Sequence, residues 1–80
     1  MDFNTQLFNF VFSEKFSEKV LNDCFLLICE TENKYNGFTV PQVICIRAYL
    51  KTMRKRVLNE NKSLIHTFDD LFSGIINYNF

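Results

Sequence analysis

The chain has 80 residues, of which 48% are apolar and ten are phenylalanine, and its formal net charge at pH 7 is zero. This length suits one small domain over residues 1–80. The longest uninterrupted apolar run, CFLLIC at 24–29, is too short to cross a bilayer, so no membrane span is expected.

The first predicted element is helical and covers about residues 3–30, as one bent helix or as two helices broken near Ser13. Asp2 can cap its start. Apolar residues recur at helical spacing through Phe8, Phe12, Phe16 and Val20. The tandem FSEKFSEK at 12–19 fits this stripe, and we interpret it as helix interior. A short strand over 7–12 stays open, because aromatic residues also alternate there.

The second predicted helix covers 40–59 and has the clearest start signal. Thr39 and Gln42 form a capping-box pair, while Phe38 and Val43 occupy the hydrophobic-staple positions. The preceding polar stretch 30–37 ends in Asn-Gly, which favours a loop or a small hairpin. One apolar seam follows the helix: Val43, Ile46, Leu50, Met53 and Val57.

A third helix is predicted over 68–77, with Thr67 and Asp70 as an acidic variant of the capping box. Leu64 and Ile65 are expected to form an extended bridge before it. Its apolar face consists of Phe68, Leu71, Phe72, Ile75 and Ile76. These elements predict an all-α fold, a compact three- or four-helix domain.

Catalysis is not expected, and no catalytic residue is assigned. His66 is the single histidine, and the only glycines, Gly37 and Gly74, form no phosphate-binding loop. The three cysteines form no CxxC pair, so neither a metal site nor a cofactor is predicted. We expect all three to be buried in a reducing compartment, with the protein cytoplasmic.

Protein binding is the predicted function. Six of the ten phenylalanines lie within residues 1–25, and Phe3, Phe8, Phe10 and Phe12 are hard to bury together in so small a bundle. Aromatic anchors are typical of interfaces. The sequence therefore predicts a regulator, inhibitor, adaptor or assembly subunit that binds another protein or a second copy of itself. Residues favoured by AT-rich codons make a phage or viral source plausible.

The alternative function is nucleic-acid binding, with a nuclear location. Residues 40–63 carry six basic residues and one acidic residue, and Arg47, Lys51, Arg54 and Lys55 follow the second helix. The order of short helix, longer helix, extended Leu64–Ile65 and short helix also resembles a histone-fold subunit. That resemblance implies a heterodimer partner. The family's central helix is typically longer than the 23 residues available from Val40 to Lys62.

Overall fold

Residues 2–77 fold into four α-helices and one short 3-10 helix, so the predicted all-α class is confirmed. A computed structural model describes residues 2–77; Met1 and 78–80, which the predicted domain and its tail include, lie outside the described part. The elements are α1 (Phe3–Val11), α2 (Glu18–Lys34), α3 (Val40–Glu60), η1 (Lys62–Leu64) and α4 (Ile65–Ile76). Residues 2–77 contain no strand, so the alternative of a strand over 7–12 is wrong.

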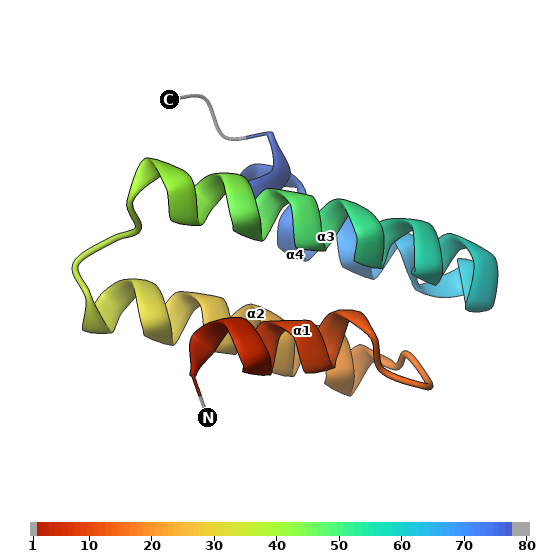
Figure 1. Cartoon of the computed structure of the whole chain (residues 1–80). Helices are drawn as coiled ribbons and strands as arrows, with labels where there is room; N and C mark the ends of the chain where they lie inside the picture. The colour runs from red at the N-terminus through yellow and green to blue at the C-terminus, as the bar shows by residue number, and fades with distance from the viewer. Residues whose placement is uncertain (1, 78–80) are drawn as a thin grey trace.

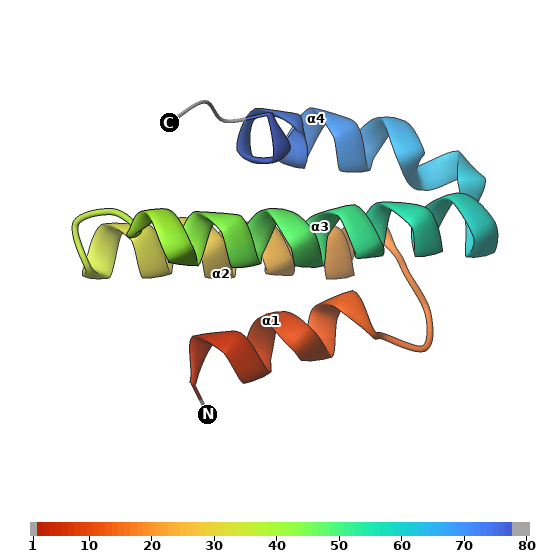
Figure 2. The same ribbon diagram turned by 45° about the horizontal axis from the view of Figure 1, so that its top comes forward.

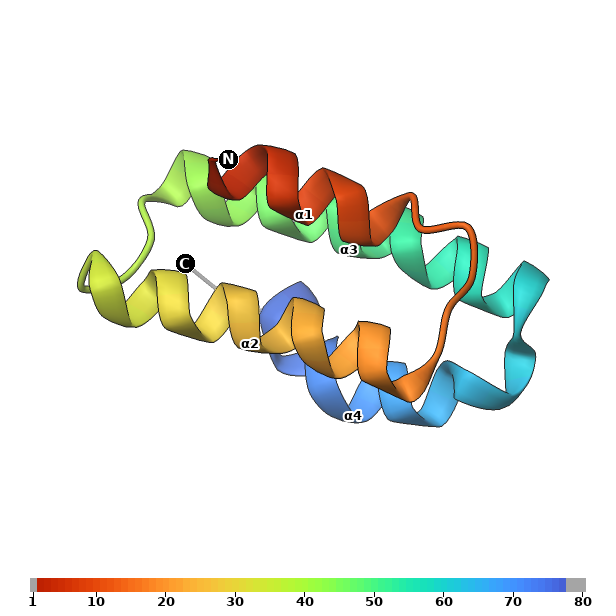
Figure 3. The ribbon, with the colours of Figure 1, turned by 90° about the horizontal axis from the view of Figure 1, so that it is seen from below.

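The helices form two antiparallel pairs, α1 with α2 and α3 with α4 (Figures 1 and 3). Both α1 and α4 pack against α2 and against α3, which places α2 and α3 diagonally across the core. All buried side chains of the described part are apolar: Leu7, Val11, Phe16, Leu21, Cys24, Ile28, Ile46, Leu50, Met53, Val57, Leu64, Phe68 and Phe72. The predicted seam of the central helix therefore faces this core, except that Val43 is only half-buried.

The first predicted element consists of two helices rather than one bent helix, which was one of the two alternatives that the sequence left open. The Asp2 carboxylate accepts from the Thr5 N–H at 2.7 Å, which lowers the Asp2 pKa and caps α1 as expected. The interpretation of FSEKFSEK as helix interior is wrong, because most of the repeat lies in the connection between α1 and α2. Ser17 ends that connection by accepting from the Val20 N–H at 3.2 Å as the N-cap of α2.

The turn before α3 follows the sequence signals closely. Asn36 and Gly37 have φ angles of 58° and 106°, the left-handed region that Asn-Gly favours. The Gly37 N–H donates to the Glu32 carbonyl at 2.8 Å, so α2 continues to Lys34 rather than ending near residue 30. The capping box of Thr39 and Gln42 is formed, and α3 extends one residue beyond the predicted 59.

The start of α4 differs from the prediction. The expected extended bridge at Leu64 and Ile65 is helical, since Leu64 ends η1 and Ile65 begins α4. Thr67 therefore lies inside the helix, and α4 has no side-chain cap. The helix can start early because Leu64 packs into the core and the chain turns directly from Asn61 through η1. It ends at Ile76, one residue short of the predicted end.

Replacing Gly74 with alanine should stabilise the domain. Gly74 lies within α4, and a Cβ atom built there meets nothing within 4 Å. Alanine has the higher helix propensity, so we expect a gain of about 0.5–1 kcal/mol in the free energy of unfolding, measured in urea. Gly37→Ala is the matched control and should destabilise, because its φ of 106° strains any residue with a Cβ. A loss of stability in Gly74→Ala would contradict this reading of α4.

Candidate functional site

The four phenylalanines predicted to face a partner divide into two pairs. Phe3 and Phe10 are half-buried and pack against the core, and the Phe3 ring stacks on Phe38 with centroids 5.6 Å apart. Phe8 and Phe12 are 47% and 46% exposed. The structure therefore leaves one pair accessible on α1 and draws the other pair into the bundle.

The two exposed rings continue onto α3. The Phe8 centroid lies 4.7 Å from that of Phe12 and 6.4 Å from that of Tyr49, which Phe8 meets edge to face. Tyr49 is itself half-buried. An aromatic row thus bridges the outer side of the α1–α3 contact.

Further apolar residues are exposed on the outer surface of α3. Val40 and Ile44 are 52% and 55% exposed, and Ala48 follows at the same four-residue spacing. Exposed Cys45 precedes Tyr49 by one turn. Figure 2 shows α3 in front of α2, with α1 on one side and α4 on the other, and no helix of residues 2–77 lies in front of α3 in this view. We name the following set the apolar face: Phe8, Phe12, Val40, Ile44, Cys45, Ala48 and Tyr49.

Sequence reasoning missed the α3 part of the apolar face. The signal was available, since Val40, Ile44 and Ala48 lie roughly opposite the buried seam when 100° is allowed for each residue. The same geometry corrects the expectation for the cysteines. Cys24 is buried and Cys29 half-buried, but Cys45 is exposed on the outer side of α3.

The four basic residues predicted to bind nucleic acid also fall into two pairs. Arg47 Nε donates to the Ile76 carbonyl at 2.7 Å. Arg54 donates two hydrogen bonds to the Asp69 carboxylate, from Nε at 2.8 Å and from Nη2 at 3.0 Å. This hydrogen-bonded guanidinium lowers the Asp69 pKa, so the contribution of the pair to stability is present above the pKa of a free carboxyl and is lost as the pH falls below it, through the lowered pKa of Asp69. Both arginines thus join α3 to α4, while Lys51 and Lys55 are exposed.

Arg56 is a contact residue that the sequence analysis did not single out. Its Nη1 donates to the Val11 carbonyl at the end of α1 at 2.9 Å, and its Nη2 reaches Glu60 at 3.0 Å. Its guanidinium carbon also lies 5.6 Å from the Phe12 ring centroid and 5.1 Å from that of Phe16. Only tertiary packing distinguishes it from Lys55, its neighbour in the sequence.

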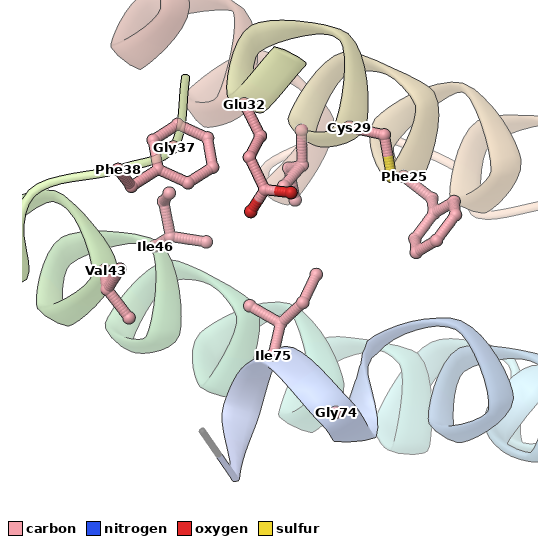
Figure 4. A pocket seen from close by; sticks show the side chains of 10 residues that line it. Phe25, Cys29, Glu32, Gly37, Phe38, Val43, Ile46, Gly74 and Ile75 are labelled. Atoms are coloured by element: carbon pink, nitrogen blue, oxygen red, sulfur yellow. The ribbon is translucent and has the colours of Figure 1, made fainter. Parts of the chain in front are cut away.

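A pocket of about 380 Å³ lies between α2, α3 and the last turn of α4 (Figure 4). Its walls are largely apolar, with the Cys29 thiol and the Glu32 carboxylate as polar groups. Burial, then the charges of Glu32 and Glu30, raise the pKa of Cys29. Burial alone raises the pKa of Cys24 to about 12, so this second thiol stays protonated in the core.

Other site types have little support in the described structure. Within residues 2–77, no three His, Cys, Asp or Glu side chains gather as a metal site would need. Over the same range, none of the helices combines the length and the hydropathy that a membrane crossing would require.

No protein-family model, curated protein or solved structure matches the chain.

Proposed function

We propose that this protein is a non-enzymatic binding module, acting as a regulator or an assembly subunit, whose apolar face docks on another protein or on a second copy of the chain. The observation that carries the proposal is the amount of apolar surface exposed on α1 and α3: Phe8 packs against Phe12 and meets Tyr49 edge to face, and Val40, Ile44 and Cys45 are exposed on α3. Exposed apolar patches mark interaction sites on protein surfaces.

The energetics of the apolar face suit docking. Fully burying a Val, Ile or Phe side chain contributes about 1.5–3 kcal/mol, so covering the exposed half of one contributes about 1 kcal/mol. Val40, Ile44, Phe8 and Phe12 are each close to half exposed. Because Val40, Ile44 and Phe8 lie on helices and Phe12 caps the end of α1, little backbone order remains to be lost on binding. Lys51 and Lys55 flank the face and would interact with acidic groups of a partner.

Ile44→Asp should abolish docking without unfolding the domain. The substitution places a charge in the middle of the apolar face, while Ile44 makes no part of the core. We expect binding of an apolar fluorescent dye to fall, and either a concentration-dependent increase in molar mass or a captured partner to be lost. Light scattering and affinity capture measure these effects, and the thermal midpoint should stay within a few degrees of wild type.

Leu26→Asp is the matched control, because Leu26 is 53% exposed on α2, which lies diagonally across the core from α3. It introduces the same charge at an equally exposed apolar position outside the apolar face. Association that both variants retain, or that both lose equally, would rule out the apolar face as the docking surface.

A further inference from the structure

The pocket between α2, α3 and α4 is large for so small a domain. Protein interiors pack with few voids, and an engineered apolar cavity of about 150 Å³ already admits benzene. This pocket measures about 380 Å³. Part of its wall is firm, because Ile28 and Ile46 are only 3% and 2% exposed and belong to the core. It can therefore hold an apolar body of roughly eight carbons without displacing core side chains.

Among residues 2–77, Glu32 is the one residue whose carboxylate lines the pocket. Figure 4 shows it projecting from α2 into the space above Ile75. Within the part of the chain that the structure describes, Glu32 takes part in no ion pair. Of the nearby cations, Lys34 lies over the Tyr35 ring and Arg47 donates to the Ile76 carbonyl.

The helix ends around the pocket bring partial charges of both signs to it. The C-termini of α2 and α4 bring partial negative charge to its rim, and the N-terminus of α3 brings partial positive charge. That positive end is already capped, because Thr39 and Gln42 hydrogen-bond to each other's backbone N–H groups. The full charge of Glu32 therefore dominates the polar part of the pocket.

We infer that this pocket binds a small organic amine, whose apolar body fills the cavity while its protonated nitrogen pairs with Glu32. The inference stands apart from the proposed docking function, since the pocket and the apolar face share no residue. The raised pKa of Cys29 comes first from burial, which disfavours any charge, and next from the charges of Glu32 and Glu30, which disfavour an anionic ligand in particular.

Three probes of equal chain length test the inference: n-octylamine, n-octanol and n-octanoate at pH 7. The readout is the rate of maleimide labelling at Cys29, measured by peptide mass spectrometry. Exposed Cys45 serves as the internal reference, and buried Cys24 should not react in the folded protein. We expect octylamine to protect Cys29 at concentrations about two- to fivefold lower than octanol, the effect of one exposed ion pair. Octanoate should protect Cys29 least, and any protection of Cys45, which belongs to the apolar face, should be the same for octylamine and octanol.

Two variants make the outcome decisive. Glu32→Gln should bring octylamine and octanol to equal potency, because it removes the charge and keeps the shape. Gly74→Leu should weaken all three probes by adding a side chain beside the cavity in a helix that tolerates one. Equal protection by the three probes in wild type, an amine preference that survives Glu32→Gln, or no protection at all would overturn the inference. Ile44→Asp should leave probe binding unchanged, which separates this site from the apolar face.

Discussion

Phe72→Ala is expected to lower the free energy of unfolding by about 3–5 kcal/mol. Phe72 has no exposed surface, and its ring centroid lies 4.8 Å from that of Phe68 and 6.0 Å from that of Phe25. Truncation would open a cavity where α4 meets α2. A domain of this size has a total stability of roughly 4–12 kcal/mol, so the loss is a large fraction of that stability, and at the lower end of the range the variant is largely unfolded at 25 °C.

Phe8→Ala provides the comparison within the same residue type. Phe8 is 47% exposed, so its removal should cost about 1 kcal/mol, measured by urea denaturation followed by circular dichroism. If Phe72→Ala is too unfolded to titrate, Phe72→Leu should show an intermediate loss of about 1–2 kcal/mol. Equal losses at positions 8 and 72 would contradict the packing described for α4.

Arg56→Ala is expected to lower the free energy of unfolding by about 2–3 kcal/mol. This loss is unusually large for a charged helix residue whose side chain is partly exposed. Three interactions disappear together: the hydrogen bond to the Val11 carbonyl, the contacts with the Phe12 and Phe16 rings, and the bond to Glu60. The first two hold α1 and its connection against α3. Chemical denaturation measures the loss, and amide exchange should show it first in α1.

Lys55→Ala is the matched control for Arg56→Ala. Lys55 is the preceding residue on α3 and is exposed, so its removal should change stability by less than about 0.5 kcal/mol. Arg56→Lys should fall between them, because an ammonium can reach one acceptor but lacks the planar fork. Indistinguishable effects of Arg56→Ala and Lys55→Ala would show that α1 is held by its apolar contacts alone.

Much of the fold could be predicted because it depends on local rules. The capping box of Thr39 and Gln42 and the positive φ angles at Asn36 and Gly37 follow from short-range chemistry. The central seam follows from periodicity alone. These signals fix where α3 begins and which of its sides meets the core, and both expectations are confirmed.

The errors occur where tertiary contacts decide between nearly equal local alternatives. Residues 12–19 have a helix-like period, but Ser17 caps the next helix and Phe16 packs into the core with Arg56 beside it. Thr67 could have capped α4, yet burial of Leu64 favours an earlier start. Helix propensities differ by only tenths of a kcal/mol per residue, so such contacts outweigh them.

The candidate site was only partly predictable for a related reason. Composition identified the N-terminal phenylalanines, but not which of them the bundle would bury. Phe8 differs from Phe10 only in its position around α1 relative to α2 and α3. Likewise, the partners of Arg47 and Arg54 lie 29 and 15 residues away in the sequence, beyond any local pattern.

The shortness of α1 has a thermodynamic consequence. Nine residues are too few to remain helical alone in water, so α1 depends on its contacts with the other helices and on the Arg56 bond. Yet α1 supplies the two exposed rings of the apolar face. A partner bound over those rings would favour the state in which α1 is packed on the other helices. Partner binding and the stability of the bundle are therefore linked by mass action.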